Sequence, residues 1–105
     1  MVRQSSLSIE RYRVPVRAYA DPTGTAPRFA FILTAEPEAG DWAAGTWDAA
    51  GWDGTWAYGL SPLVSGTDGG ATVAVADGCY SMWIEVTGAG GELSKRRTPV
   101  AIDIY

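Results

Sequence analysis

The sequence predicts an all-β fold, a single antiparallel β-sandwich of about seven strands. Short runs in which apolar and polar residues alternate recur at intervals of roughly 8–12 residues. The chain of 105 residues contains 13 glycines and 6 prolines, which favour turns. No segment of useful length spaces its apolar residues as a helix does. We expect one domain over residues 9–105, preceded by an N-terminal arm, residues 1–8.

The first strand is expected in residues 12–20, where apolar and polar residues alternate. The residues on its buried face are Tyr12, Val14, Val16, Ala18 and Ala20. Pro15 lacks an N–H, so this strand should lie at a sheet edge. The sequence Asp-Pro-Thr-Gly-Thr at 21–25 predicts the turn that ends it.

Residues 29–34 are apolar on both faces, as expected of a central strand: Phe29, Phe31 and Leu33 alternate with Ala30, Ile32 and Thr34. Residues 35–55 fit neither a strand nor a helix, because their tryptophans recur every fifth residue. We expect a loop or short irregular strands there.

Further strands are predicted in the second half of the chain, at 56–60, 71–75, 80–87 and 99–105. In the first of these, alternation is carried by Trp56, Tyr58 and Leu60; in the last, by the inward residues Val100, Ile102 and Ile104. The separating turns are predicted at Ser61-Pro62, 66–70, Asp77-Gly78 and 88–91.

Composition disfavours several functional classes. Histidine is absent, which removes the commonest general base and zinc ligand. Cys79 is a single cysteine and can form neither an internal disulfide nor a metal cluster. The net charge of −4 is unfavourable for binding nucleic acid. Polar residues follow Met1, so we expect no signal peptide, no membrane partner and synthesis in a cytoplasm. Because histidine and a cysteine cluster are missing, we also expect no cofactor or metal.

Charge is segregated along the chain. Basic residues occur only in 3–28 and at Lys95, Arg96 and Arg97, and the intervening segment carries only acidic charges. Basic and acidic strands could pair across one sheet, or complementary faces could orient neighbours in an assembly. The basic triplet itself could be a solvated edge that discourages strand addition, a contact with an acidic neighbour or a contact with nucleic acid.

Residues 75–86, Val-Ala-Asp-Gly-Cys-Tyr-Ser-Met-Trp-Ile-Glu-Val, resemble the E–F corner and F strand of immunoglobulin-like domains. The resemblance implies a structural corner of Asp77, Gly78 and Tyr80, in which the tyrosine hydroxyl bonds back to the backbone. Met82 stands where antibody domains have their second cysteine.

Three segments together resemble small structural proteins of tailed phages that infect actinobacteria: 10–16, 41–47, and 78–86 followed by 95–100. The chain departs from that pattern by extra Trp and Gly at 51–59 and by the tip at 88–91. The resemblance implies a virion protein without enzymatic activity. Its place would be the head, as a decoration or minor capsid protein, or else the neck or tail. Its partners would be the major capsid protein or another virion protein in repeated copies, together with homo-oligomeric copies of this chain in an assembly.

The Trp-rich segment is the first candidate site. Its members are Trp42, Trp47, Trp52 and Trp56, with Asp41, Asp48 and Asp53 beside them. The tryptophans could pin a Gly-rich loop onto a core poor in Leu and Ile, form a protein contact, or bind sugar rings for attachment to a host surface. Pinning of the loop is the favoured interpretation, and Trp42, Trp47 and Trp52 are the candidates if the segment makes a protein contact.

Other polar residues have simpler explanations. Glu36, Glu38 and Asp41 could supply a glycosidase acid and base, although solvated loop charge explains them better. The spacing of Asp48 and Asp53 matches no calcium loop. Cys79 has no basic neighbour in sequence that would activate it as a nucleophile.

The N-terminal arm is the last candidate. A neighbouring chain could hold it, with Arg3 paired to an acidic surface, or it could add a strand to its own sheet through Leu7 and Ile9. If a neighbour holds it, deleting residues 1–6 should weaken incorporation into particles and hardly change the melting temperature.

Overall fold

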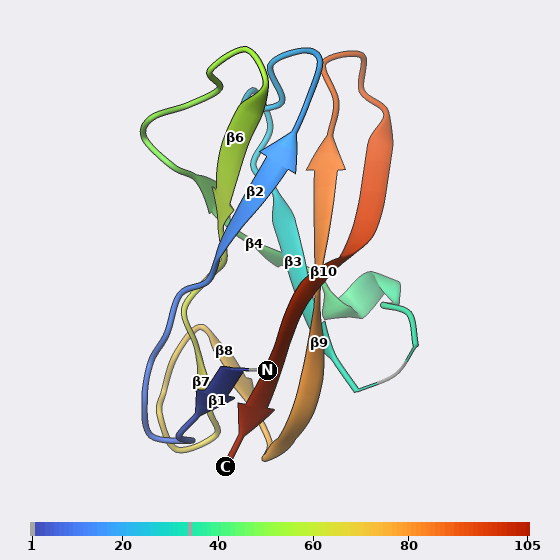
Figure 1. The fold of residues 1–105 in the computed structure, drawn as a ribbon. Coiled ribbons are helices and arrows are strands. Elements are labelled where there is room, and N and C mark those ends of the chain that lie inside the picture. The colour runs from blue at the N-terminus through green and yellow to red at the C-terminus, as the bar shows by residue number, and fades with distance from the viewer. Residues whose placement is uncertain (1, 34) are drawn as a thin grey trace.

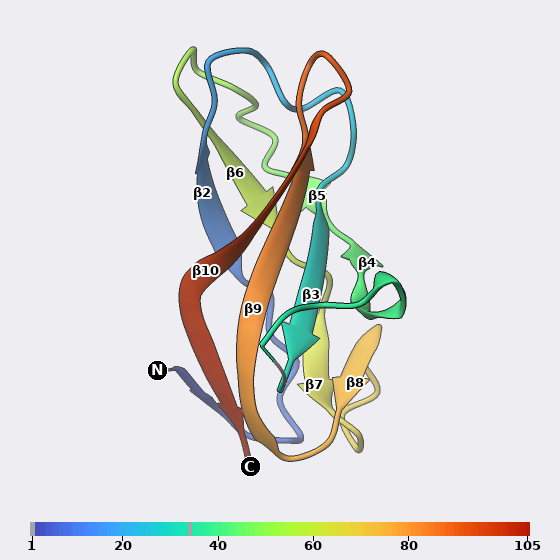
Figure 2. The ribbon, with the colours of Figure 1, turned by 90° about the vertical axis from the view of Figure 1, so that its right-hand side faces the viewer.

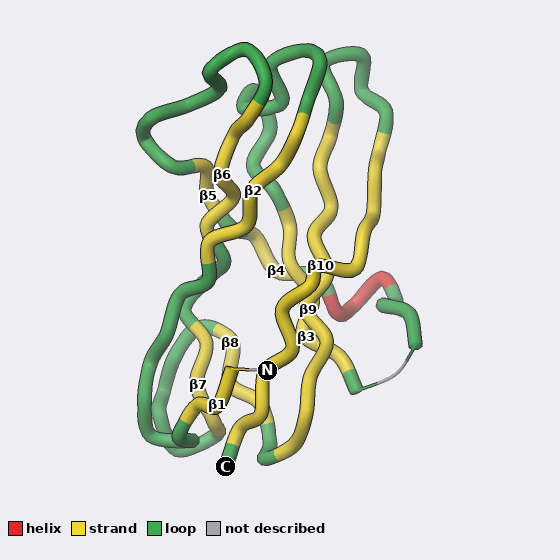
Figure 3. Tube along the Cα trace, in the orientation of Figure 1, coloured by secondary structure: helices red, strands yellow, loops and turns green. Residues whose placement is uncertain are grey.

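The computed structural model describes residues 2–33 and 35–105, and it confirms an all-β fold (Figures 1 and 3). One sheet has five strands in the order β1 (Val2–Gln4), β10 (Leu93–Ile104), β9 (Gly78–Thr87), β3 (Arg28–Ile32) and β4 (Ala43–Ala44). A second sheet has three, β2 (Arg13–Arg17), β6 (Trp56–Leu60) and β5 (Thr46–Trp47). A two-stranded sheet joins β7 (Val64–Gly66) to β8 (Val73–Val75), and a single 3₁₀ turn, η1, spans Ala39–Asp41 within the described segments.

The two larger sheets form two layers with the main core between them; Figure 2 shows β2 and β6 in one layer and β3 and β9 in the other. This core contains Val14, Phe29, Met82 and Ile84. A second cluster, of Tyr80, Ile102 and Ile104, lies nearer the two chain ends. No helix among residues 2–33 and 35–105 is long and apolar enough to cross a membrane.

Several expectations for individual strands are confirmed. β2 lies at a sheet edge, as Pro15 predicted, and β3 lies between β9 and β4. Residues 35–55 contain only η1 and the two-residue strands β4 and β5. Leu33 follows the end of β3 and is exposed. Met1 and Thr34, which the predicted arm and third strand included, lie outside the described residues.

The number of strands exceeds the seven that were predicted, and the antiparallel arrangement holds for five of the seven strand pairs in the described residues. Ten strands occur in the described part of the chain, and two pairs are parallel, β1 with β10 and β7 with β8. The missed strands β1 and β7 are three residues long and bury polar residues such as Gln4 and Ser65, so they show no apolar alternation. β10 also begins six residues before the predicted Pro99.

The inward face of β6 differs from the one its apolar residues suggested. Ala57 and Gly59 face the core, and Trp56 is 39% exposed. A Cβ on Gly59 would lie 3.1 Å from Ile84 Cδ1 and 3.2 Å from Phe29 Cζ. Because these two large side chains fill the space, the facing strand must present small residues.

β10 is divided by an irregularity in its pairing with β9 between Arg97 and Ala101. After the irregularity, residues 102–104 lie between β9 and β1. Before it, residues 93–97 pair with β9 alone. The five-stranded sheet therefore has a free edge along the first half of β10.

Candidate functional site

The Trp-rich segment is fastened to a neighbouring loop by two indole hydrogen bonds. Trp47 Nε1 donates to Thr25 O at 2.8 Å, and Trp52 Nε1 donates to Ala18 O at 3.1 Å. Both acceptors belong to the connection between β2 and β3. These contacts agree with the interpretation in which the tryptophans pin a Gly-rich loop.

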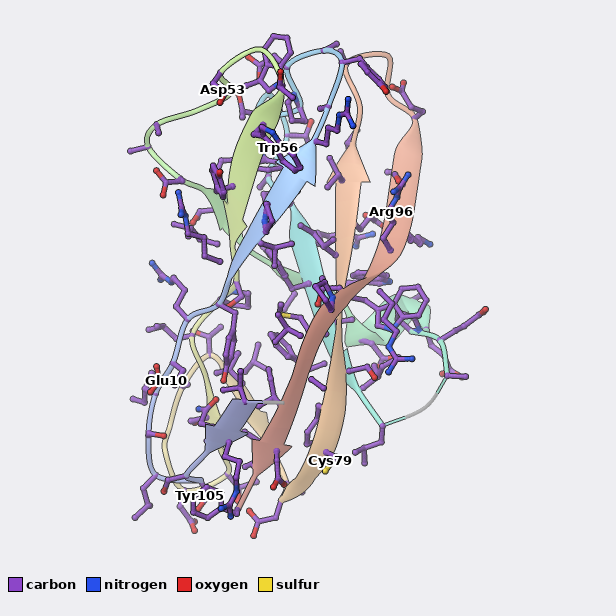
Figure 4. The ribbon with its side chains drawn as sticks, in the orientation of Figure 1. Glu10, Asp53, Trp56, Cys79, Arg96 and Tyr105 are labelled. Atoms are coloured by element: carbon purple, nitrogen blue, oxygen red, sulfur yellow. The ribbon has the colours of Figure 1, made fainter. Side chains whose placement is uncertain are left out.

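The aspartates of this segment hold its turns. The Asp53 carboxylate accepts hydrogen bonds from Trp56 N at 2.7 Å and Thr55 N at 2.9 Å, and these bonds lower the pKa of Asp53, the Trp56 bond most. Figure 4 shows Asp53 and Trp56 at the loop end of β6. Asp48 accepts from Ala50 N at 2.9 Å. Each carboxylate is thus already bound to backbone N–H groups.

Asp48 and Asp41 also serve local structure. Asp48 Oδ2 lies 3.5 Å from Arg13 Nε, and that guanidinium stacks 3.8 Å from the centroid of the Tyr58 ring. Asp41 Oδ2 accepts from Glu38 N at 2.7 Å at the start of η1. No group of three or more His, Cys, Asp or Glu residues in the described chain is arranged to hold a metal ion.

The four tryptophans do not form one aromatic platform. Trp42 lies beside the five-stranded sheet, with its ring 5.8 Å from both Arg28 Cζ and Lys95 Nζ. Trp47 and Trp52 are half-buried against the loop to which they donate. Among the described residues, the close aromatic ring pair is Tyr12 with Phe31, and it includes no tryptophan.

A buried ion-pair cluster crosses three strands of the larger sheet. Glu85 on β9 is 4% exposed, its Oε1 accepts a hydrogen bond from Arg28 Nε at 2.7 Å, and the same oxygen lies 2.6 Å from Arg28 Nη2. Lys95 Nζ on β10 lies 3.8 Å from Oε2. The expectation that basic and acidic strands pair across one sheet is confirmed here. Burial of the carboxylate without both cations would be costly, so Lys95 and Arg28 are structural partners.

The corner residues lie where the sequence motif placed them. Tyr80 is buried and its hydroxyl donates to Ala76 O at 2.7 Å. Gly78 begins β9, and Asp77 precedes it on the exposed bend. Burial raises the pKa of Tyr80, and the charge of Asp77 raises it further. The hydrogen bond ties β9 to the turn after β8.

The N-terminal segment adds a strand to its own sheet, by residues other than those expected. β1 pairs with β10, whereas Leu7 and Ile9 are exposed. Arg3 lies 3.6 Å from Asp103 and 4.6 Å from the centroid of the Tyr105 ring. Arg3 therefore has an acidic partner within its own chain.

Gln4 was not singled out by the sequence, although it is 2% exposed. Its Nε2 donates to Val64 O at 2.8 Å and Ser8 O at 3.0 Å, and its Oε1 accepts from Tyr12 Oη at 2.5 Å. One amide thus joins β1, β7 and the start of the β2 region. An isolated polar residue among polar neighbours gives no sequence signal of burial.

A groove of about 630 Å³ opens between β2 and the first half of β10. Its apolar lining includes Val14, Val16, Ile84 and Val86. Its charged lining consists of three arginines, Arg17, Arg96 and Arg97, and one carboxylate, Glu92. Figure 4 shows Arg96 on the outer strand of this side. Tyr19, which is 91% exposed, also borders the groove. Sequence reasoning missed the groove because it depends on how the two sheets separate.

Cys79 and the basic triplet are the remaining candidates. Cys79 is exposed, and its Sγ lies 3.7 Å from Asp103 Oδ1. Arg96 and Arg97 have no ion-pair partner among the described residues, unlike Lys95. The basic triplet is therefore divided into one structural residue and two free cations.

Comparison of the chain with protein-family models, with curated proteins and with solved structures gives no match. The candidate site consequently stands on its own geometry: an apolar groove with a basic rim and an exposed tyrosine.

Proposed function

We propose that this protein is a non-enzymatic structural component of a tailed-phage virion that binds repeated copies of another virion protein. Its place is the head, as a decoration or minor capsid protein. The resemblance of segments 10–16, 41–47, 78–86 and 95–100 to structural proteins of actinobacterial phages supports the virion setting.

We further propose that the fold is an immunoglobulin-like β-sandwich. Two features support this assignment: the hydrogen bond from the Tyr80 hydroxyl to Ala76 O, and the burial of Met82 between two layers of strands. The N-terminal strand that joins β10 in parallel is an addition to the seven strands first expected.

The observation that carries the binding role is the uneven use of charge. The carboxylates Asp41, Asp48 and Asp53 are bound to backbone N–H groups in turns, whereas Arg96 and Arg97 lack acidic partners in the described chain. Cations left free beside an apolar groove favour a partner of opposite charge. Carboxylates engaged in turns are poorly suited to general acid–base catalysis.

Immunogold labelling of purified phage particles with an antibody to this protein tests the proposal. The expected result is label at regular positions on the head. Label at the neck or tail would support the virion role but place the protein there instead of on the head. Absence of the protein from particles, by labelling and by mass spectrometry of dissociated virions, would overturn the proposal. A glycan array with the purified protein tests the rival role in sugar binding, for which we expect no bound sugar.

A further inference from the structure

We propose that the groove between β2 and β10 receives an extended acidic segment of the partner protein, which adds as a strand to the free edge of β10. This inference deepens the proposed function and rests on it for the identity of the partner as a virion protein. Backbone hydrogen bonding would give the affinity, and alternate side chains of the segment would enter the groove.

The first half of β10 offers an unused row of backbone groups. Gly88 N donates to Glu92 O at 2.7 Å, and this bond shows which residue pairs of the β9–β10 hairpin are hydrogen-bonded. In an antiparallel ladder with this register, the backbone N–H and C=O groups of even-numbered β10 residues bond to β9, and those of odd-numbered residues point away from β9. The N–H and C=O groups of Leu93, Lys95 and Arg97 therefore face outward on the side where β1 does not reach.

The edge of β2, on the opposite side of the groove, is less suited to strand addition. Ala18 N donates to Thr55 O at 2.9 Å, and Ser61 N donates to Tyr12 O at 2.8 Å. In this register the backbone N–H and C=O groups of even-numbered β2 residues therefore point toward β6. The outward positions are Arg13, Pro15 and Arg17, and proline has no N–H to offer. An added strand would lose a bond in the middle of β2, whereas the β10 edge is uninterrupted from Leu93 to Arg97.

The floor of the groove suits alternate apolar side chains. Val16 and Val86 pack against the main core and remain half-buried. Both line the groove, together with the core residues Val14 and Ile84. A strand rises about 3.3 Å per residue, so roughly five residues match the free edge. Covering the two valines would extend the core that already lies between the sheets.

Charge selects the occupant. Three arginines, Arg17, Arg96 and Arg97, and a single carboxylate, Glu92, line the groove, so its charge is positive on balance. None of the three arginines has an ion-pair partner within residues 2–33 and 35–105. A second copy of this chain presenting the same β10 edge would oppose Lys95, Arg96 and Arg97 with themselves, and its free β2 edge is also basic. Repulsion therefore disfavours edge-to-edge pairing of copies, and an acidic segment is favoured.

A capped model peptide of about seven residues, in which glutamate and valine alternate, provides the probe. Titration followed by heteronuclear NMR should perturb the amides that line the groove. Hydrogen exchange should slow by at least about tenfold at Leu93, Lys95 and Arg97, which lack bonds in the free protein. The matching lysine–valine peptide should not bind. Absence of binding by the acidic peptide, or protection confined to β2, would overturn the inference.

Two versions of the acidic peptide separate strand addition from simple charge attraction. One is N-methylated at every valine and the other at every glutamate. Because only alternate N–H groups of an added strand face β10, one version must lose binding by at least about tenfold and the other must stay within roughly threefold. Any other pattern overturns strand addition.

Charge reversal provides the matched variants. R96E should weaken binding of the acidic peptide by at least about tenfold, whereas R11E, an equal change at an exposed arginine outside the groove, should have little effect. Melting curves check that both variants fold. On phage particles, R96E should fail to attach where R11E attaches. Normal attachment of R96E overturns the groove but leaves the virion role intact, while failure of the wild-type protein to attach overturns the role itself.

Discussion

The two ends of the molecule are built differently. At the end that carries both termini, β1, β7 and β8 are joined by buried polar residues, among them Gln4 and Ser65. At the opposite end, the loops after β2 and before β6 are held by half-exposed tryptophans, and a groove separates β2 from β10. Buried hydrogen bonds thus join the strands at the end with the termini, which we call the closed end. At the other end, the strand edges of β2 and β10 pair with no further strand of the described chain.

Gln4→Ala should have the largest effect, because it breaks the closed end. The change leaves Val64 O and Tyr12 Oη without their buried partner, and each such loss costs on the order of 1–3 kcal/mol. We expect a loss of about 3 kcal/mol in unfolding free energy by urea denaturation. Arg3→Ala on the same strand removes an exposed ion pair and should cost less than about 1 kcal/mol. Equal losses would show that the buried amide contributes no more to stability than the exposed ion pair.

Gly66→Ala tests how tightly the same end is packed. A Cβ at Gly66 would lie 2.4 Å from Ser6 Cβ and 2.6 Å from Ser6 Cα, so the backbone must move. The expected cost is about 2 kcal/mol, measured by thermal or urea unfolding. Gly24→Ala, in the loop after β2, meets nothing within 4 Å and should change stability by only a few tenths, roughly, of a kcal/mol. Comparable effects at both sites would contradict the difference between the ends.

Tyr80→Phe removes the bond to Ala76 O and should cost about 1 kcal/mol. The folded protein raises the pKa of Tyr80 by burial and by the charge of Asp77. The stability from this shift is therefore present below the unfolded tyrosine pKa of about 10 and is lost as the pH rises through the higher folded pKa. The urea midpoint should fall on going from pH 8 into this alkaline window, less steeply in Tyr80→Phe. Some slope should remain from Tyr12, whose pKa burial and Glu10 also raise.

Trp52→Phe should have the smallest effect, because its single hydrogen bond to Ala18 O is only partly buried. A loss of about 0.5 kcal/mol is expected. Amide exchange should quicken in the loops around Ala18 and stay unchanged around Gln4. Faster exchange at both ends would mean that the two ends open together rather than separately.

Apolar alternation in the sequence predicted the strands whose stability comes from apolar burial. Phe29, Met82 and Ile102 gave this signal, and they are core residues. Gln4 and Ser65 did not, because they are buried through side-chain hydrogen bonds to backbone groups, which leave no apolar pattern in the sequence. Parallel pairing of β1 with β10 joins residues from opposite ends of the chain, and a single sequence carries no local sign of it.

The candidate site was predictable only in part. The basic triplet was recognised, but its division into a structural Lys95 and two free arginines depends on the buried Glu85 across the sheet. The tryptophan contacts to Thr25 and Ala18 required the loop positions. The groove requires the separation of two sheets, which no spacing of residues encodes.

The parallel pair of β1 and β10 also constrains the order of events during synthesis. Residues 2–4 are synthesised about one hundred residues before their partners, residues 102–104, and Ser6 N donates to Tyr105 O at 2.6 Å. At about 5–20 residues per second, β1 waits roughly 5–20 s for its partner. Until then β1 has no strand with which to pair, and Gln4 cannot be buried. The sheet at this end of the molecule can thus form only after residues 102–104 have been synthesised, and a nascent chain that still lacks them leaves β1 unpaired and available to chaperones and proteases.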